Sequence, residues 1–343
     1  DIHGKLGQGE ITTQLTQLGE TCLAAAYRLA VQELKRFGRP LYRYEGRLAE
    51  ANLAVIGLGK MGGGELNYHS DLDIIFVYDH QGMTDGEKQV SNHEYFAKLA
   101  QKIISILSMQ TREGYVYKID TRLRPSGNAG PLVTSLDSFL TYHRKEAQIW
   151  ERQALTKARV VLGDEILASQ LHDVIRHTVY GFSIDDDGRG EIHRLRMRME
   201  NELARESGGS YNIKTGRGGM VDVEFAAQYL QLKYGCRFPE LRTTSTIVAL
   251  KEVQTLGLVP DGAAETLLTG YKFLRKLENR LRIIHDYSSN DLTGSKSYLN
   301  KLARRMGYDA SLRNPGAALI ADYEEITGRI RDCYDRILGD QAG

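Results

Sequence analysis

The segment from Asn52 to Tyr78 constrains this chain more than any other stretch of its 343 residues. It reads NLAVIGLGKMGGGELNYHSDLDIIFVY: an apolar run, five glycines between positions 57 and 64, and a second apolar run that opens with Asp71 and Asp73. Apolar runs bounded by glycine-rich turns are typical of buried strands. The segment therefore predicts a strand, a glycine loop, a short helix and a second strand, in that order.

The two aspartates predict a metal site. Side chains alternate faces along a strand, so Asp71 and Asp73 point to the same side, about 7 Å apart. Like charges on one face repel unless a cation lies between them, and Mg²⁺ prefers carboxylate and phosphate oxygens. Glycines lack Cβ atoms, so their backbone N–H groups can approach phosphate oxygens closely. The expected phosphate contacts are Gly62, Gly63, Ser70 and Lys60.

A dinucleotide site is the rival interpretation of the glycines. They match G-x-G-x-x-G after a strand, and Asp79 follows Gly59 by twenty residues, as a ribose-binding acid would. Such a fold needs a crossover helix of about ten residues or more, whereas residues 63–70 are short, glycine-rich and polar. It also leaves the D-x-D pair unexplained. A glycine loop, a short helix and D-x-D on the next strand instead resemble the nucleotidyltransferase superfamily, whose fold is of the polymerase-β type.

Members of that superfamily carry a third carboxylate on a neighbouring strand, and the resemblance implies one downstream. Residues 115–120 read YVYKID, a strand pattern that ends in Asp120. If the strand continues, Asp120, Arg122 and Arg124 share one face. One carboxylate beside two guanidiniums suits a metal ion and a triphosphate. Asp120 thus completes a set of three catalytic, metal-binding acids, and the two arginines are expected to clamp the triphosphate.

Four ordered blocks bring the resemblance closer. They are GKMGGGELNYHSDLDIIFVY, YKIDTRLRPSGNAGPLVTS, WERQALTKARVVLGD and IKTGRGGMVDVEFAAQYL, which span residues 59–230. FLRKLENRLRIIHD at 273–286 extends the match. The blocks resemble successive motifs of the glutamine synthetase adenylyltransferase family, whose bifunctional enzymes adenylylate and deadenylylate glutamine synthetase with two homologous halves. The length corresponds to one half, and SGNAG, ERQAL and DVEF resemble the C-terminal, adenylylating half more than the other.

The resemblance implies a chemistry and its participants. The reaction is Mg²⁺-dependent transfer of AMP from ATP to a tyrosine hydroxyl of glutamine synthetase, with two Mg²⁺ ions, in the regulation of nitrogen metabolism. A PII-type signal protein and glutamine are the implied regulators. Asp222 and Glu224, in the first turn of a helix, either compensate the helix dipole or face the catalytic cleft. Further residues placed near the site are Lys157, Arg159, Lys214 and, as a weaker candidate, Glu151.

The expected fold class is α+β: a mixed sheet with helices, followed by an all-helical bundle. The expected domains are an N-terminal helical segment at 1–50, the nucleotidyltransferase domain at 51–184 and the bundle at 185–343. DDDGRG at 185–190 reads as a charged linker. Beyond it, apolar residues recur every three or four positions in several segments, which predicts a bundle. Earlier, Ser91 and Glu94 form a capping box that predicts a helix to about residue 109.

Two polar features interrupt the bundle pattern. Residues 211–219 form a basic, glycine-rich entry to a helix, which predicts a second anion site. Arg275, Asn279 and Arg282 form a polar stripe on one helix, and we expect this stripe to be solvated or to dock the protein substrate.

Composition narrows the classes of function. Hydrophobic residues make up 41% and charged residues 26%, and the formal charge is +1, so a nucleic-acid-binding surface is not expected. Three scattered cysteines fit a reducing compartment and no zinc site. No apolar run is long enough to span a membrane and no signal peptide is evident, so we expect a cytoplasmic protein without a membrane partner. The first residue is Asp rather than Met, which suggests a fragment.

Several other functions remain open at this level. The same metal site could run the phosphorolysis that removes AMP from adenylylated glutamine synthetase, or it could transfer UMP to a signal protein. The chain could also be a regulatory nucleotide-binding module without turnover, although three clustered acids would serve no purpose there. An NAD-binding protein is the remaining alternative.

Overall fold

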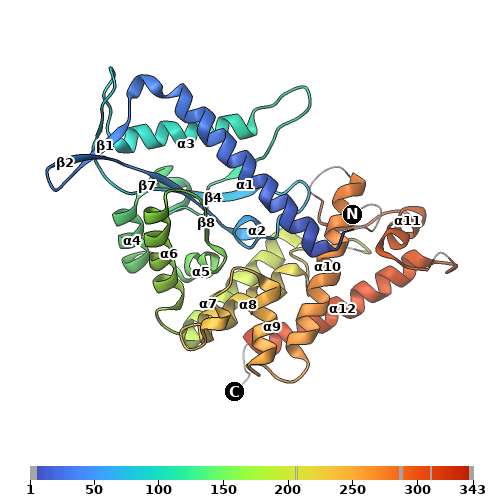
Figure 1. The fold of residues 1–343 in the computed structure, drawn as a ribbon. Coiled ribbons are helices and arrows are strands. Elements are labelled where there is room, and N and C mark those ends of the chain that lie inside the picture. Colours follow the sequence, from blue (N-terminus) through green and yellow to red (C-terminus); the bar gives the residue numbers. More distant parts are fainter. Residues whose placement is uncertain (1–5, 205, 207, 286–288, 310, 340–343) are drawn as a thin grey trace. The chain divides into compact units, whose positions relative to one another are not determined.

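The computed structural model describes residues 6–204, 206, 208–285, 289–309 and 311–339. The chain divides into two compact units, residues 1–181 and 182–343. The first unit contains a mixed sheet with helices and the second is helical, which confirms the expected α+β class (Figure 1). Among the described residues, no helix has both the length and the apolar character that crossing a membrane requires.

The first unit is built on a five-stranded sheet. Its strand order is β6-β4-β3-β8, and β7 also pairs with β4. β3 is antiparallel to β4 and β8, whereas β6 and β7 run parallel to β4. In chain order the elements of this unit are α1 (Gln8–Glu33), β1 (Pro40–Tyr44), β2 (Arg47–Glu50), β3 (Leu53–Gly57), α2 (Gly59–Gly62), β4 (Leu72–Tyr78), β5 (Met83–Thr84), α3 (Asn92–Ser108), β6 (Ile119–Asp120), β7 (Val133–Ser135), α4 (Leu136–Lys145), α5 (Ile149–Ala154), β8 (Arg159–Leu162) and α6 (Glu165–Tyr180).

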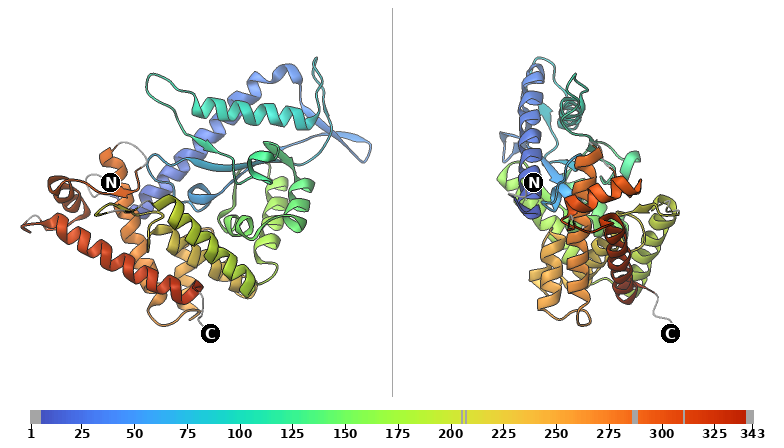
Figure 2. Two further views of the ribbon diagram at one scale, coloured as in Figure 1. Left: turned by 180° about the vertical axis from the view of Figure 1, so that it is seen from behind. Right: turned by 90° about the vertical axis from the view of Figure 1, so that its right-hand side faces the viewer.

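Alternation along β4 separates the core from the acids. Leu72, Ile74 and Phe76 pack in one buried cluster with α1 and α3, and Asp73 therefore belongs to the opposite face. Figures 1 and 2 show α1 and α3 on one face of the sheet, with α4 and α6 on the other. This is the predicted arrangement of strand, loop, short helix and strand. Ser91 is the N-cap of α3, as predicted, because its hydroxyl accepts the backbone N–H of Glu94.

The predicted strand at 115–120 is too long. Only Ile119 and Asp120 form β6, because the N–H groups of Val116 and Tyr117 donate to the carbonyl of Leu107 at the end of α3. The chain turns directly after Asp120, so the expected shared face of Asp120, Arg122 and Arg124 does not form. Residues 40–50, expected within a helical segment, form the β1–β2 hairpin instead.

The second unit is a helical bundle, as predicted. The apolar stripe of α10 (Leu267, Tyr271, Leu274, Leu277 and Leu281) is fully buried. The residues read as a linker at 185–190 are instead the N-cap and first turn of α7, because the Asp185 carboxylate accepts the N–H of Gly188. The elements are α7 (Asp186–Met199), β9 (Tyr211–Asn212), α8 (Met220–Tyr234), α9 (Thr246–Thr255), α10 (Ala263–His285), β10 (Asp291–Leu292), α11 (Lys296–Met306) and α12 (Pro315–Leu338).

The polar stripe on α10 is buried rather than solvated. Arg275, Asn279 and Arg282 are 4%, 2% and 4% exposed. Glu278 lies between the two arginines on the same face and pairs with both, at 3.1 Å to Arg275 and 2.9 Å to Arg282. One shared carboxylate offsets much of the cost of burying two guanidinium groups, so this stripe is part of the bundle interior and offers no docking surface.

Candidate active site

The strand pairing brings two of the three predicted acids together. β4 and β6 run parallel with Asp73 directly opposite Asp120. Adjacent strands lie about 4.8 Å apart and opposed residues share a face, so these two side chains are neighbours. Asp71 lies two residues before Asp73, at the exposed entrance to β4. The start of β4 and its pairing with β6 therefore bring all three acids to the same end of the sheet.

Gly59 closes one side of this acid cluster. Its φ of +50° favours glycine, and a Cβ atom at this position would lie 2.6 Å from Oδ2 of Asp73. The preceding residue, Leu58, donates its N–H to the carbonyl of Asp73 at 2.9 Å. The glycine loop and the acid-bearing strand are thus in direct contact.

The loop amides predicted to cradle phosphate are occupied within the loop. The N–H of Gly62 donates to the carbonyl of Leu58, and that of Gly63 to the carbonyl of Gly59. Gly62 is needed for another reason: a Cβ atom there would lie 1.8 Å from the carbonyl oxygen of Lys157. Ser70 is buried and accepts the N–H of Asn67, whereas Lys60 in α2 is half-buried.

Arg122 supplies the positive charge of the cluster. Its guanidinium forms an ion pair with Asp120 at 2.5 Å, and its side chain is 73% exposed. Hydrogen bonds from Arg122 hold the pKa of Asp120 below its ordinary value. The same bonds, and then the charges of Asp73 and Asp71, raise the pKa of Arg122. Arg122 therefore sits in the field of all three acids.

Arg124 organises the loop that follows β6. Its guanidinium donates to the carbonyls of Thr121, Gly130 and Pro131 at 2.9–3.3 Å. These bonds fold residues 121–131 back on themselves, so the structure assigns Arg124 to loop geometry rather than to the open face beside Asp120.

The basic residues before and on β8 lie against the glycine loop. Lys157 is 6% exposed and pairs with Glu65 at 3.2 Å. Arg159 donates to the carbonyls of Met61 and Gly62 at 3.1 and 3.2 Å. Glu151, the weaker candidate acid, is buried and accepts the hydroxyl of Tyr142 and the N–H of Gln148.

Lys214, Asp222 and Glu224 belong to the second unit. Lys214 is half-buried. Asp222 is fully buried and pairs with Arg196 at 2.5 Å, while Glu224 accepts the hydroxyl of Tyr271 at 2.9 Å. Asp222 is thus an interior ion-pair partner, not a solvated acid that compensates the dipole of α8.

At the start of α8, where the sequence predicts a second anion site, two backbone amides are already bonded within the protein. The N–H groups of Met220 and Val221 donate to the carbonyls of Ile213 and Lys214, at 3.0 Å each. The first turn of α8 is therefore satisfied by the glycine-rich loop that precedes it, and it does not present these amides to an anion.

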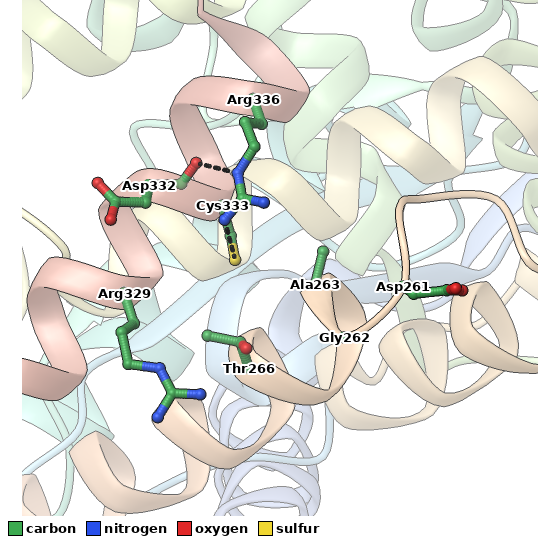
Figure 3. A pocket seen from close by; sticks show the side chains of 8 residues that line it. All are labelled: Asp261, Gly262, Ala263, Thr266, Arg329, Asp332, Cys333 and Arg336. Atoms are coloured by element: carbon green, nitrogen blue, oxygen red, sulfur yellow. Dashed lines mark hydrogen bonds between the residues drawn. The ribbon is translucent and has the colours of Figure 1, made fainter.

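A hollow of about 200 Å³ opens in the second unit between the start of α10 and the end of α12 (Figure 3). Arg336, at its rim, donates to the carbonyl of Asp332 and approaches the sulfur of Cys333 (Figure 3). The described residues that line this hollow include none of the predicted site residues.

The donor chemistry at β4 and β6 fits a hard divalent cation. Mg²⁺ needs only one or two carboxylates, because substrate phosphates and water complete its coordination. Asp73 and Asp120 provide such a pair. Within the described residues, no three His, Cys, Asp or Glu side chains lie close enough to hold a metal ion together. The geometry therefore fits a metal shared with a nucleotide better than a cage made by the protein alone.

Two acids that sequence reasoning missed also reach this region. Glu20 of α1 pairs with Arg159, and Glu65 with Lys157. Glu65 could have been singled out as the lone acid next to the glycine loop. No local pattern points to Glu20, because its partner lies 139 residues away in sequence.

Comparison with known proteins identifies two family models and several relatives that match this chain. The family model for glutamate-ammonia ligase adenylyltransferase matches residues 1–173, and the model for GlnD PII-uridylyltransferase matches residues 191–338. Three similar proteins are named bifunctional glutamine synthetase adenylyltransferase/adenylyl-removing enzyme. The protein of Thioalkalivibrio sulfidiphilus is 38% identical over 310 residues, which is 90% of this chain and 32% of the relative. That of Chromobacterium violaceum is 37% identical over 308 residues, 90% of this chain and 34% of the relative.

The third relative extends the match over almost the whole chain. The protein of Methylococcus capsulatus is 33% identical over 341 residues, 99% of this chain and 35% of the relative. The chain thus spans about a third of the length of the curated relatives it matches. Since the first family model covers the glycine loop, all three acids and the whole sheet, the chain belongs to the glutamate-ammonia ligase adenylyltransferase family.

Proposed function

We propose that this chain transfers AMP from ATP to a tyrosine hydroxyl of glutamine synthetase and releases pyrophosphate. The observation that carries the proposal is the register of β4 and β6, which sets Asp73 beside Asp120 and against Gly59. Carboxylates beside a glycine loop suit a metal-bound triphosphate. The names of the relatives supply the reaction type and the protein substrate.

Asp71, Asp73 and Asp120 are the proposed holders of two Mg²⁺ ions. When bound there, Mg²⁺ would neutralise phosphate charge and lower the pKa of the attacking phenol from its usual value of about 10. Arg122 is exposed, so its guanidinium can turn from Asp120 to the oxygens of a triphosphate. Lys60, Ser70 and Lys214 stay proposed phosphate contacts. The amides of Gly62 and Gly63 already donate within the loop, so we propose that these two glycines allow the tight backbone turn beside the acids.

Arg124, Lys157 and Arg159 are better explained as parts of the scaffold. Each has its guanidinium or ammonium group on a protein carbonyl or carboxylate. We propose that they shape the site without touching the nucleotide.

The direction of the reaction is inferred from three short sequence motifs. SGNAG, ERQAL and DVEF favour adenylylation. Phosphorolytic removal of AMP from glutamine synthetase is the second candidate, because the relatives are named for both activities. It would use the same acids, with phosphate in place of the tyrosine hydroxyl.

Uridylyl transfer to a PII-type protein is a third candidate. It is favoured by the match to GlnD PII-uridylyltransferase. That match lies in residues 191–338, within the helical unit, whereas the acids and the glycine loop fall in the adenylyltransferase match. We therefore propose glutamine synthetase as the substrate, and a PII-type protein and glutamine as regulators.

The test compares three reactions. The chain is incubated with glutamine synthetase, Mg²⁺ and α-labelled ATP; with adenylylated synthetase and phosphate; and with a PII-type protein and labelled UTP. We expect label on the synthetase only in the first tube and no transfer after addition of a chelator. Release of ADP in the second tube would show that the chain removes AMP instead of adding it. Label on the PII-type protein would show that this protein, and not glutamine synthetase, is the substrate.

Variants connect the activity to the acids. Asp73→Asn and Asp120→Asn should each lower transfer at least roughly 100-fold, because a carboxylate that neutralises transition-state charge is lost. Asp173→Asn, at an exposed position on α6, is the matched control. Normal activity in either site variant would remove the metal assignment.

A further inference from the structure

The glycine loop is fastened by two cations that come from the segment at the start of β8. Arg159 donates to the carbonyls of Met61 and Gly62, which end the short helix α2. The carbonyl of Lys157 comes so close to Gly62 that no side chain fits there. The loop therefore takes its position from β8 as well as from the strands on either side of it.

Lys157 and Arg159 each form an ion pair with a carboxylate as well. Lys157 and Glu65 are 6% and 8% exposed, and their charged atoms lie 3.2 Å apart. Glu65 follows the loop directly, and its N–H donates to the carbonyl of Lys60. A buried ion pair requires both partners, because either one alone leaves an uncompensated charge in the interior. This pair joins the end of the loop to the start of β8.

Helix α1 braces the same loop from outside. Glu20 pairs with Arg159, and Thr16, one turn earlier, accepts the N–H of Leu66 at 3.1 Å. Gly19, between them, allows Leu66 to pack within van der Waals reach of the helix. Thr16 and Gly19 thus contact Leu66 directly, and Glu20 reaches Met61 and Gly62 through Arg159.

These anchors matter because α2 has only four residues. Helices of that length are not stable by themselves, so tertiary contacts must fix the loop that bears Gly59 against Asp73. We propose that Glu65 and Glu20 are positioning residues for the nucleotide: through Lys157 and Arg159 they hold the glycine loop beside the acids. On this proposal, Lys157 and Arg159 do not bind phosphate. The inference rests on the proposed nucleotidyl transfer for its kinetic consequence.

The test measures KM for ATP and kcat in Glu65→Gln, Lys157→Met and the double variant. It also follows amide hydrogen exchange of residues 59–66 without nucleotide. We expect each single variant to raise KM roughly tenfold with a smaller change in kcat, because a misplaced loop weakens nucleotide positioning. Exchange in residues 59–66 should be faster in both, and the double variant should be no worse than either single variant.

Glu65→Gln separates this proposal from a phosphate-binding lysine. If Lys157 contacted the triphosphate, removal of its competing carboxylate would leave KM unchanged or lower it, and that result would overturn the proposal. The double variant has similar volume and no isolated charge, so it stays testable even if a single variant does not fold. It too should show a raised KM and faster exchange at 59–66.

Glu20→Gln provides an independent measurement with a matched control. It should raise KM and speed exchange at 59–66 in the same way, whereas Glu33→Gln, which breaks the exposed pair of α1 with Lys102, should do neither. Equal amide exchange at residues 59–66 in the Glu20 and Glu33 variants would contradict the proposal that Glu20 holds the glycine loop. If the wild-type chain transfers no AMP, the proposed function fails, while the exchange measurement still decides whether these acids hold the loop.

Discussion

Two glycines of one loop have positive φ angles in different surroundings. Gly59, at +50°, would place a Cβ atom 2.6 Å from the Asp73 carboxylate, whereas Gly64, at +69°, has no atom within 4 Å of such a Cβ. An alanine costs about 1–2 kcal/mol at either site from backbone strain. Only at Gly59 does it also displace a proposed metal ligand. Comparison of the two alanine variants therefore distinguishes the effect of backbone strain from the effect on catalysis.

Gly59→Ala should therefore lower AMP transfer at least roughly 100-fold, because the Asp73 carboxylate must move. Gly64→Ala should keep transfer within about threefold. Both should lower Tm by a similar few degrees, since the backbone cost is shared. Activity and thermal unfolding of the two variants, measured side by side, check this. Equal activities would show that the loop tolerates a Cβ atom beside Asp73.

His143 of α4 is a second residue with a measurable signature. Its ring nitrogens are buried, neither has a hydrogen-bond partner among the described residues, and the ring lies edge-on to Phe139. Burial lowers the pKa of His143 from 6.5 to about 4. Between these values the unfolded chain binds the proton and the folded chain does not, so stability is full above about pH 6.5 and falls as the pH drops toward 4.

His143→Phe should remove this dependence, because a phenyl ring fills the same space without titrating. At pH 5 the wild type should have lost about 2 kcal/mol of unfolding free energy relative to pH 7, beyond any loss in the variant. Unfolding midpoints of both proteins from pH 7 to pH 4.5 measure the difference. Parallel curves would mean that the folded chain protonates His143 without cost.

At the scale of elements, an interior ion network joins α7, α8 and α12. Asp222 accepts the N–H of Gly218 and pairs with Arg196, whose guanidinium also reaches the carbonyl of Gly216 at 2.8 Å. Arg331 approaches Asp222 at 3.5 Å and Glu200 at 2.7 Å. Through Gly216 and Gly218, the network thus fixes the glycine-rich loop that precedes α8.

Asp222→Asn should destabilise this unit by about 3–5 kcal/mol, because it leaves the fully buried Arg196 without its closest carboxylate. Glu325→Gln breaks the exposed pair with Arg329 on α12 and should cost about 0–1 kcal/mol. Urea unfolding followed by helical circular dichroism gives both values. A loss under about 1 kcal/mol in Asp222→Asn would mean that solvent or another carboxylate compensates Arg196.

Elements whose pattern is complete within one segment could be predicted from the sequence. β3 and β4 have apolar runs, α10 has a regular stripe, and the strand period puts Asp73 on the face opposite Leu72 and Ile74. Features that depend on a distant partner could not be predicted. β6 is short because α3 takes the amides of Val116 and Tyr117, and Glu20 has a role only once Arg159 is folded against it.

The polar stripe of α10 shows the same limit in another form. A row of arginines on a helix reads as solvated unless the pattern reveals a carboxylate on the same face. Glu278 stands at the right spacing from both Arg275 and Arg282, but burial of all three depends on how the bundle packs. Spacing within a helix identifies the partners, whereas tertiary packing decides whether water reaches them.

At the scale of the whole molecule, nearly all of the proposed site residues belong to the first of the two units. Residues 1–181 contain the sheet, the three acids, the glycine loop and both ion pairs that hold it. Among the proposed phosphate contacts, only Lys214 belongs to the second unit. The proposed chemistry therefore depends mainly on residues of the first unit.

A chain that ends at Gly181 should fold, because it retains the sheet and its helices, but it should bind Mg·ATP more than roughly tenfold more weakly than the full chain. The reason is that the proposed contact of Lys214, a charged contact worth about 1.5–3 kcal/mol, is lost; an affinity within about threefold of that of the full chain would remove Lys214 from the proposed contacts. Circular dichroism checks the fold of the shortened chain, and titration calorimetry measures the affinity. Lys214→Ala in the full chain is the matched variant: a loss in both proteins would assign the contact to Lys214, whereas a loss in the shortened chain alone would assign it to other residues of the helical unit.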